Sequence, residues 1–572
     1  MVKYRFLILF AVLCSAAFAY QYPIKDVKGL HSASFAEMRP DHFHSGVDIK
    51  TDGAQGKPVV AAADGYISRI SHSPYGYGLA VYVVHPKDGS MTVYAHLSRF
   101  EHCMDKLVKG YRYQYGVNSV DMTFEAMEYP VAAGDIIGYS GNTGNSFGPH
   151  LHYELRNASG THTYNIVRRG LFRPQDKVAP QLLRLHYIEV DTLEGVAVEA
   201  TKRSFDLKKV GGDKYTIQGS VRVGRNGYFL LECRDRQSSN ATSRFGIYRV
   251  EQRVDGVKCF EYRMDGFAFA DTRTCDLVSY YPMQRSAKCE VIRLAKMDAA
   301  PDYRYPVEKY RGVVGARSEG QKSVAIAVED DCGNVARLDF DIVGKADNQL
   351  FTPIRDNAAT ICGAGRGVTI RDRGICVYVG ENALYEPAFC RVQMSYKSPK
   401  IEGVEVLSPS AIVLDEDMPL AGPITVSIAA LAPLPLQSKC CIAVKGSKGR
   451  YHYGGGFYAG GRVYYKTRKA GEMVVVADTT APKITPNWKS GADMRSAKRI
   501  SFRVSDNFSG VDNYELYIDG EWKTLNYSPL QSTLYHTFDT PLAAGRKTTH
   551  TLRLRVTDSV GNMAVFEDCF YK

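Results

Sequence analysis

Apolar and polar residues alternate over short runs along much of the chain, which is the pattern of strands with one buried face. Residues 150–156, 323–328 and 549–556 show it clearly. Glycine (51 residues) and tyrosine (38 residues) are plentiful, as in β domains with tight turns. The pattern predicts a mainly β protein: an antiparallel β-sheet domain at the N-terminal end, followed by β-sandwich domains.

Two hairpins are predicted in the first 100 residues. Residues 59–63 and 66–70 flank Asp64-Gly65, a dipeptide typical of a two-residue turn. Residues 79–84 and 91–97 flank a second turn, and His96 falls near the end of its returning strand. The mixed, partly helical segment at 101–129 interrupts this pattern. We expect it to form a wall or flap beside a groove.

An internal repeat marks the later part of the chain. Residues 176–180 (DKVAP) are echoed at 478–482 (DTTAP), and residues 328–334 (VEDDCGN) at 556–562 (VTDSVGN). Val254-Asp-Gly256 and Ile518-Asp-Gly520 mark hairpin turns within the two copies. Many short strands with regular turns predict a β-sandwich for each copy.

The length of 572 residues predicts several domains. The changes in composition and the repeat place their boundaries. We expect a signal peptide at 1–19, an N-terminal domain at 20–175, a β-sandwich at 176–345, a β-rich domain of unclear type at 346–477 and a second β-sandwich at 478–572.

The first 19 residues have the pattern of a secretory signal. Lys3 and Arg5 precede an apolar run, which ends at Ala17-Phe-Ala19. The run is too short to span a bilayer comfortably, so we expect an exported protein without a transmembrane span in its mature form, in the periplasm, cell envelope or extracellular space. Twelve cysteines remain after cleavage and are candidates for disulfides, with a connectivity that the sequence does not reveal.

The net charge is +11, from 72 basic and 61 acidic residues, without a long basic run. Such a balance favours an acidic polymer as partner, although an incidental charge is an equal explanation. Basic motifs interleaved with aromatic residues are absent from the sequence, so nucleic acid is not an expected partner.

Two short motifs offer candidate metal ligands. His44 and Asp48 lie four residues apart across Gly46, and His150 and His152 flank Leu151. In a strand, His150 and His152 project from the same face. Catalytic zinc uses three protein ligands drawn from imidazole nitrogens and carboxylate oxygens. His44, Asp48 and one histidine of the pair meet that requirement, which leaves the other free for proton transfer.

The motifs resemble those of the LytM or lysostaphin-type zinc endopeptidases over residues 35–156. The shared segments are HSGVD at 44–48, YAHL at 94–97, SGNTG at 140–144 and GPHLH at 148–152. The resemblance implies that His44, Asp48 and His152 are the Zn²⁺ ligands and that His150 and His96 are the catalytic pair. His42, two residues before His44, is a rival ligand on geometry alone, but the family pattern favours His44.

By that resemblance, the function is that of an exported zinc metalloendopeptidase that hydrolyses peptide cross-links of bacterial peptidoglycan. His150 would act as general base and acid and His96 would stabilise the oxyanion, with the two roles exchangeable. Two alternatives remain open. One is a wall-binding or adhesion protein with a non-hydrolysing zinc domain, and the other is a zinc protease acting on exported proteins. The two repeat copies at 176–345 and 478–572 resemble immunoglobulin-like modules. All the β domains at 176–572 are candidates for wall or protein contacts.

Overall fold

A computed structural model gives the fold. It describes residues 20–172, 174–238, 244–315, 320–344, 356–363, 365–538 and 548–572. Strands dominate, so the predicted mainly β class is confirmed. The predicted signal peptide at 1–19 lies outside the described residues. In the part of the chain that the structure describes, every helix is too short or too polar to cross a membrane.

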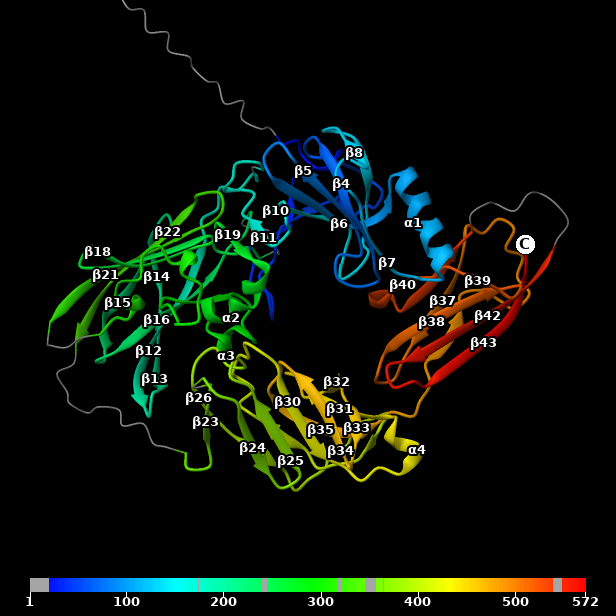
Figure 1. The fold of residues 1–572 in the computed structure, drawn as a ribbon. Helices are drawn as coiled ribbons and strands as arrows, with labels where there is room; N and C mark the ends of the chain where they lie inside the picture. The colour runs from blue at the N-terminus through cyan, green and yellow to red at the C-terminus, as the bar shows by residue number, and fades with distance from the viewer. Residues whose placement is uncertain are drawn as a thin grey trace, which may run out of the picture.

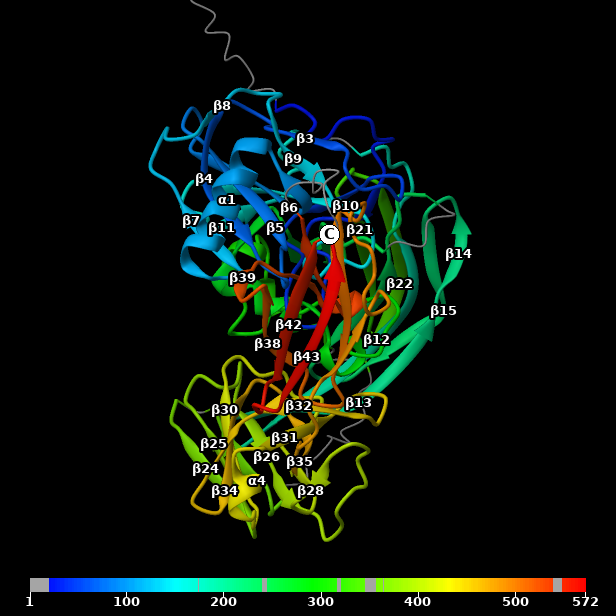
Figure 2. The same ribbon diagram turned by 90° about the vertical axis from the view of Figure 1, so that its right-hand side faces the viewer.

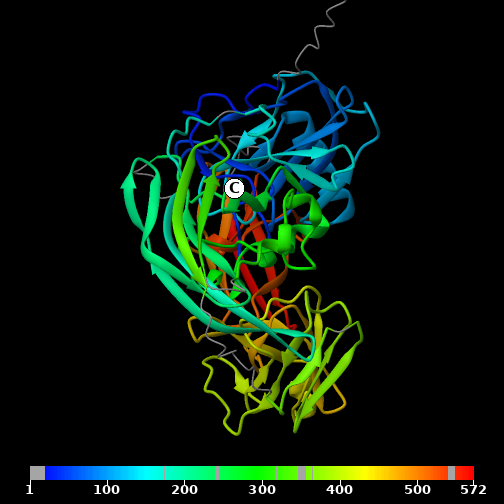
Figure 3. The ribbon, with the colours of Figure 1, turned by 90° about the vertical axis from the view of Figure 1, so that its left-hand side faces the viewer.

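Four lobes follow one another around a ring (Figure 1). We name them by residue number: the N-terminal domain (20–175), the first β module (176–344), the middle domain (356–477) and the last β module (478–572). Figure 3 shows the long blue-green strands of the first β module reaching from the N-terminal domain toward the middle domain. The predicted immunoglobulin-like type of the two β modules stays a prediction.

The N-terminal domain is built on one large sheet with the strand order β1-β2-β10-β6-β5-β4-β7. Strands β2 and β10 are antiparallel and place Asp48 opposite His152, while β6 places Ala95 opposite His152 from the other side. The order therefore gathers three distant motifs. The elements are β1 (His31–Ala33), β2 (Val47–Lys50), β3 (Pro58–Val60), β4 (Gly65–His72), β5 (Leu79–His85), β6 (Ser90–Phe100), α1 (His102–Tyr115), β7 (Val120–Thr123), β8 (Pro130–Val131), β9 (Ile136–Ser140), β10 (His150–Asn157) and β11 (His162–Tyr164).

One of the two predicted hairpins is confirmed and the other is wrong. Strands β5 and β6 pair as predicted. Strand β3, however, pairs with β9, and β4 pairs with β5. Gly65 does not adopt the positive φ of a two-residue turn; a Cβ there would lie 2.1 Å from the carbonyl oxygen of Val84. The glycine thus permits a close approach of strands rather than a reversal of the chain.

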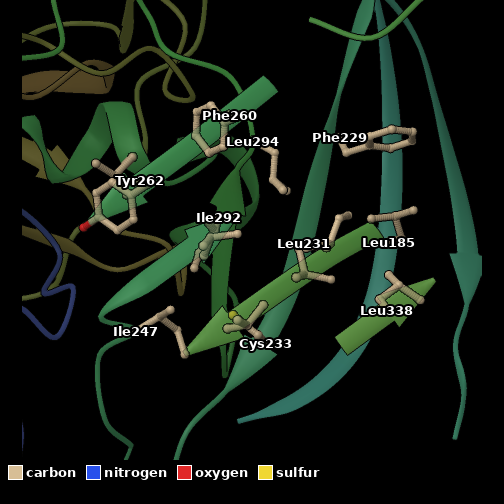
Figure 4. Close-up of a cluster of buried hydrophobic side chains, with 14 of the residues drawn as sticks. Leu185, Phe229, Leu231, Cys233, Ile247, Phe260, Tyr262, Ile292, Leu294 and Leu338 are labelled. Atoms are coloured by element: carbon tan, nitrogen blue, oxygen red, sulfur yellow. The ribbon is translucent and has the colours of Figure 1, made fainter. Parts of the chain in front are cut away.

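The first β module consists of a four-stranded sheet, β13-β12-β16-β20, and a six-stranded sheet, β14-β15-β22-β21-β17-β18. Figure 4 shows Leu185, Phe229, Leu231 and Leu338 within its core, all fully buried. The elements are β12 (Gln181–Leu193), β13 (Val196–Asp206), β14 (Lys208–Gly211), β15 (Lys214–Val223), β16 (Gly227–Arg234), β17 (Arg249–Val254), β18 (Val257–Arg263), β19 (Gly266–Ala268), η1 (Phe269–Thr274), α2 (Cys275–Val278), α3 (Tyr281–Gln284), β20 (Glu290–Arg293), η2 (Asp302–Arg304), η3 (Lys309–Gly312), β21 (Gln321–Glu329) and β22 (Val335–Gly344).

The sheet of the N-terminal domain continues into the first β module. Strand β19 pairs with β11, with Thr163 opposite Phe267. This pairing joins residues on the two sides of the boundary that we predicted at 175, so the two lobes share backbone hydrogen bonds as well as a peptide link.

Among the described residues, the middle domain holds sheets of two, five and six strands, and the last β module holds two sheets of four. The middle elements are β23 (Thr360–Cys362), β24 (Val368–Asp372), β25 (Ile375–Val379), β26 (Ala388–Cys390), β27 (Val392–Met394), β28 (Glu405–Val406), β29 (Ala411–Val413), β30 (Ile424–Ala429), α4 (Leu434–Gln437), β31 (Cys440–Lys445), β32 (Tyr451–Gly455), β33 (Phe457–Ala459), β34 (Arg462–Thr467) and β35 (Gly471–Ala477). The last elements are β36 (Lys483–Pro486), β37 (Arg499–Ser505), β38 (Val511–Ile518), β39 (Glu521–Lys523), β40 (Asn526–Ser528), η4 (Pro529–Gln531), β41 (Thr533–Thr537), β42 (Thr549–Asp558) and β43 (Met563–Tyr571).

Both turns predicted within the repeat are present. Asp255 and Gly256 join β17 to β18, and Asp519 and Gly520 join β38 to β39, all four with positive φ. The twelve cysteines between residues 103 and 569 all carry free thiols, so the structure does not bear out the expected disulfides.

Helix α1 closes the ring by contacting the last β module (Figure 2). Arg112 is buried, and its guanidinium donates to the carbonyl oxygen of Leu525 at 2.6 Å and to the side-chain oxygen of Asn526 at 3.1 Å. Asn118 donates to the carbonyl oxygen of Tyr514. Segment 101–129 therefore joins two lobes.

Candidate metal centre

The three predicted ligands meet. Nε2 of His44 lies 3.1 Å from Oδ1 of Asp48 and 3.1 Å from Nδ1 of His152, and that Nδ1 lies 2.8 Å from Oδ1 of Asp48. All three side chains are buried. A single ion can contact all of them, because their donor atoms lie within 4.8 Å of one another.

The local backbone explains why these residues converge. Asp48 and His152 are directly opposite on β2 and β10, and His44 lies in the loop before β2. A Cβ at Gly46 would lie only 2.3 Å from the carbonyl oxygen of Tyr153. Glycine therefore lets this loop lie against β10, which brings His44 within reach of the other two ligands.

Hydrogen bonds orient each imidazole for a metal. Nδ1 of His44 donates to the carbonyl oxygen of Ser34 at 2.7 Å, which leaves Nε2 as the lone-pair donor. Nε2 of His152 donates to Oε1 of Glu154 at 2.6 Å, which leaves Nδ1. The second ring nitrogen of a metal-binding histidine is commonly held in this way. Two imidazole nitrogens and one carboxylate oxygen fit zinc in a three-ligand site.

Sequence reasoning missed Glu154. Its side chain is fully buried and accepts hydrogen bonds from Ser45 (2.6 Å), Tyr77 (2.6 Å) and Arg156 (2.5 Å) besides His152. Burial alone would raise the pKa of this carboxyl, but Arg156 and His152 outweigh it and hold the pKa well below its usual range. The signal was available, because strand residues two apart share a face and Glu154 follows His152 by two.

The electrostatics favour an ionised Asp48. Burial opposes its charge, but His44 and His152 hold the pKa of this carboxyl well below its ordinary value. Burial likewise opposes a charged His152, yet the hydrogen bonds to Asp48 and Glu154 raise the pKa of His152 to about 9. Without a metal, a proton balances the buried carboxylates. A divalent cation is the natural replacement for that proton.

The two predicted catalytic histidines stand together beside the ligands. Nε2 of His150 lies 3.6 Å from Oδ1 of Asp48, and the rings of His150 and His96 are 4.7 Å apart. Nδ1 of His150 donates to the carbonyl oxygen of Gly148, and Nδ1 of His96 to that of Thr143, both at 2.8 Å. Burial lowers the pKa of both rings, that of His96 to about 3. Both are therefore neutral rings whose Nε2 can accept a proton.

His96 has an unusual backbone conformation. Its φ is +60°, and the register of β6 with its neighbours shifts beside it. A positive φ costs a residue other than glycine some free energy and is often found where a functional side chain is re-aimed. The irregularity turns the His96 ring toward His150.

His42, the rival ligand, does not join the centre. Its side chain is exposed, and Nδ1 lies 2.7 Å from Oδ1 of Asp41. Instead, Arg39 approaches Asp48, with its guanidinium 3.7 Å from Oδ2.

A cleft of about 1090 Å³ lies over the centre. His96 and His150 line it together with the ligands, and Phe147, 92% exposed, stands at its edge. Phe269 and Thr272 of the first β module also line it, which the sequence did not predict. The lining includes no residue of 101–129, so the expectation that this segment forms a wall of the groove is wrong.

Comparisons with known proteins identify the N-terminal domain. Residues 42–165 match peptidase family M23, and residues 360–478 match the Zu5-like domain. The DD-carboxypeptidase/endopeptidase Mpg of Neisseria meningitidis is 38% identical over 114 residues, which are 20% of this chain and 20% of that protein. An uncharacterized metalloprotease of Haemophilus influenzae is 37% identical over 112 residues, 20% of this chain and 18% of its own length.

Residues 42–165 form a peptidase family M23 domain. The predicted resemblance to LytM or lysostaphin-type enzymes is thereby confirmed, and family and donor set together confirm Zn²⁺ as the metal. The chain spans about a fifth of the length of the curated relatives it matches. Among solved structures, the catalytic domain of lysostaphin from Staphylococcus simulans is 26% identical, with a TM-score of 0.17, covering 24% of this chain and 86% of that one.

Proposed function

We propose that this protein is an exported zinc metalloendopeptidase that hydrolyses peptide cross-links of bacterial peptidoglycan. The observation that carries the proposal is the geometry at the base of the cleft. There, three oriented zinc ligands stand beside two neutral histidines whose Nε2 atoms are unprotonated. A domain that only held peptide would not need two such acceptors next to a metal centre.

When bound, zinc supplies Lewis-acid activation of water and of the scissile carbonyl group. His150 acts as the general base, because its Nε2 is a free acceptor 3.6 Å from a ligand atom. Its Nδ1–H bond to Gly148 fixes that tautomer and holds the ring in place. The proton then passes to the leaving amine.

His96 stabilises the oxyanion. Its Nδ1–H is already donated to Thr143, so its Nε2 can donate only when the ring carries a second proton. That second proton comes from solvent through the open cleft and returns to it, because the proton that His150 takes from water is delivered to the leaving amine. The assignment of the two roles rests on the 3.6 Å approach of His150 Nε2 to Oδ1 of Asp48.

The substrate assignment draws support from the Neisseria relative, which is named a DD-carboxypeptidase/endopeptidase. The cleft is open, and the aromatic ring of Phe147 is exposed at its edge, as suits an extended peptide. The β domains are proposed to contact the wall or a partner protein. A protease acting on exported proteins is the second candidate, because an open cleft also admits a protein loop.

Product masses from digests of purified peptidoglycan test the proposal. The zinc-loaded chain should release peptide fragments with new amino and carboxyl ends, and His150→Ala should reduce the rate by about 10²–10⁴-fold. His102→Ala, an exposed histidine on α1, is the matched control and should retain full activity. Binding to peptidoglycan without cleavage would favour an adhesion protein, and cleavage of unfolded proteins but not of peptidoglycan would favour the second candidate.

A further inference from the structure

The first β module contains a second group of side chains with metal-ligand chemistry. Asp176, Asp235 and Asp330 each offer a carboxylate oxygen, and the three oxygens lie within 4.8 Å of one another. Three separate segments supply them: the start of the module, the residue after β16 and the turn after β21. The adjacent Asp331 adds a fourth acid to the same cavity.

Two of these acids have oxygen atoms without a partner among the described residues. Asp235 is only 2% exposed, and its Oδ1 is buried without a hydrogen bond. Asp331 is 8% exposed; its Oδ1 accepts from Asn165 at 2.5 Å, whereas its buried Oδ2 has no partner. Buried carboxylate oxygens are normally hydrogen-bonded or coordinate a metal. These two atoms therefore point to a missing partner.

A small cavity separates the acids from the M23 domain. Its volume is about 20 Å³, slightly more than a single water molecule needs. The four aspartates line it together with His31, Ser34 and Val47 of the N-terminal domain. The space suits a single ion rather than a side chain or an organic ligand.

Basic side chains do not balance this charge. Arg168 is the nearby cation, but it donates to Glu329 and to the backbone oxygen of Asp331 rather than to the clustered carboxylates. Burial, reinforced by the neighbouring acids, raises the pKa of Asp235 to about 9. The described side chains thus leave the acids uncompensated.

The last β module repeats the arrangement. Asp478, Asp506 and Asp558 also bring three carboxylate oxygens within 4.8 Å of one another. In both modules the Gly-Asn turn of the sequence repeat builds the same contacts. Oδ1 of Asp330 accepts from the backbone nitrogen of Asn334 at 2.9 Å, and Oδ1 of Asp558 from that of Asn562 at 2.7 Å. The repeat therefore carries a three-aspartate constellation along with its turns.

We propose that Asp176, Asp235 and Asp330 bind a calcium ion at the junction between the M23 domain and the first β module, with Asp331 as a fourth acid of the same site. Calcium takes only oxygen ligands, at about 2.3–2.6 Å, so that oxygens on opposite sides of the ion lie about 4.6–5.2 Å apart. The three oxygens lie within 4.8 Å of one another, close enough to contact a single ion of this kind. Zinc, in contrast, prefers the nitrogen-rich set found in the cleft.

The ion would hold in place the backbone segments that carry and orient the zinc ligands His44 and Asp48. The carbonyl oxygen of Ser34 orients His44, and Val47 immediately precedes Asp48. Both Ser34 and Val47 line the calcium cavity. The site thus links the first β module to the two segments that carry zinc ligands. This proposal does not depend on the substrate of the peptidase.

Calcium titration of the zinc-loaded full chain tests the proposal. The Asp506→Asn background leaves only the junction site, and CaCl₂ is the probe in isothermal titration calorimetry, with MgCl₂ in parallel. We expect the Asp506→Asn chain to bind one equivalent of Ca²⁺ and to gain several degrees in Tm. Adding Asp235→Asn should abolish both effects, whereas adding the exposed Asp213→Asn should change neither.

The outcomes separate cleanly. A chain that binds no Ca²⁺ in the Asp506→Asn background, or one that binds it equally after Asp235→Asn, overturns the site. Tighter binding of Mg²⁺ than of Ca²⁺ overturns the identity of the ion. The Tm of the Asp235→Asn chain without calcium is the control for folding. A value at or above that of the parent chain shows that the variant is folded. If that variant fails to fold, Asp331→Asn, which removes the other unpartnered oxygen, should weaken Ca²⁺ binding at least tenfold; unchanged binding would refute the proposal.

Discussion

The zinc centre and the aspartate cluster lie on opposite sides of strands β1 and β2, and they manage buried charge in different ways. In the zinc centre each histidine ligand has a partner: Ser34 for His44, and Glu154 for His152. In the cluster, Asp235 and Asp331 keep oxygens without partners. The histidine ligands of the zinc centre are already oriented by hydrogen bonds in the metal-free chain. The unpartnered aspartate oxygens of the cluster, in contrast, need a bound ion as their partner.

The difference follows from the ligands themselves. Two histidines and one aspartate can be buried together without a metal because a proton on His152, whose pKa is raised to about 9, balances the ionised Asp48. A cluster of carboxylates contains no base that could carry a balancing proton, so burial and the neighbouring acids instead raise the pKa of Asp235 to about 9 and favour its protonated form. The aspartate cluster is therefore the better candidate for an ion that stabilises the fold, and the zinc centre for an ion that does chemistry.

Removing a zinc ligand should give the largest effect. His44→Ala leaves only two ligands, so the chain should lose its zinc, and peptidoglycan hydrolysis should fall to the rate without enzyme. The Asp235→Asn variant should keep its zinc, because Asp235 belongs to the other centre. Zinc content by elemental analysis and the release of peptide fragments measure both. Zinc retained by His44→Ala would contradict the ligand assignment.

The same isosteric change should have opposite signs in the two centres of the metal-free chain. The pKa of Asp48 is held far below its usual value, so its ionised form stabilises the fold at pH 7 and Asp48→Asn should cost about 1–3 kcal/mol. The pKa of Asp235 is raised to about 9, so Asp235→Asn should stabilise the fold by about 1–2 kcal/mol. Unfolding in a metal-chelating buffer measures both. Equal signs would remove the contrast.

A variant of Glu154 tests how much the hydrogen bond that orients His152 contributes to zinc binding. Glu154→Gln weakens the acceptor that holds Nε2 of His152, so zinc affinity should fall by about 10–100-fold without loss of the fold. The exposed Glu125→Gln is the matched control. Competition with a chromogenic chelator measures the affinity. An unchanged zinc affinity would show that the carboxylate only fills space.

The sequence predicted the zinc centre far better than its surroundings. His150 and His152 are two residues apart, so their spacing predicts that they share one face of a strand. His44 and Asp48 are four residues apart, so one short loop can bring them together. Glu154 lies on the same face, but a charged residue in an alternating run is ordinarily taken for a solvated one. Phe269 lies more than a hundred residues beyond the last motif, and only the pairing of β11 with β19 brings it to the cleft.

The aspartate cluster and one hairpin show the other limits. The sequence repeat was visible as two Gly-Asn turns, but Asp235 lies apart from either repeated motif, so only the fold unites it with Asp176 and Asp330. At Asp64-Gly65 the dipeptide indicated a turn, whereas the glycine is required by the approach of β4 to Val84. Local sequence patterns predict local backbone geometry, but they do not predict which distant segments pack against one another.

The pH dependence of the metal-free first β module sharpens the comparison further. A carboxyl whose pKa rises from about 4 unfolded to about 9 folded destabilises the folded state progressively as pH rises through that window. Stability should therefore fall between about pH 4 and pH 9, by up to about 1.4 kcal/mol per pH unit. Saturating calcium should flatten this part of the profile. If calcium leaves the slope of stability against pH unchanged, the slope arises from other buried acids. Glu290, whose pKa is raised to about 8 by burial, is one of them.

The last β module provides the smallest and most discriminating effect. Asp506 takes the place of Asp235 in this cluster, and its Oδ1 is likewise buried without a partner among the described residues. The residue as a whole, however, is only partly buried, and its Oδ2 accepts from the backbone nitrogens of Phe508 and Gly510. The position of Asp331 is taken by Ser559, so this cluster carries one acid fewer. Asp506→Asn should therefore change the stability of the metal-free chain by less than about 0.5 kcal/mol, the range of ordinary surface changes. Thermal unfolding of the two variants side by side measures the difference. If Asp506→Asn stabilised the metal-free chain as much as Asp235→Asn does, then deep burial at the junction would not be the reason that the empty aspartate cluster is destabilising. The three-aspartate arrangement common to both modules would be the reason instead.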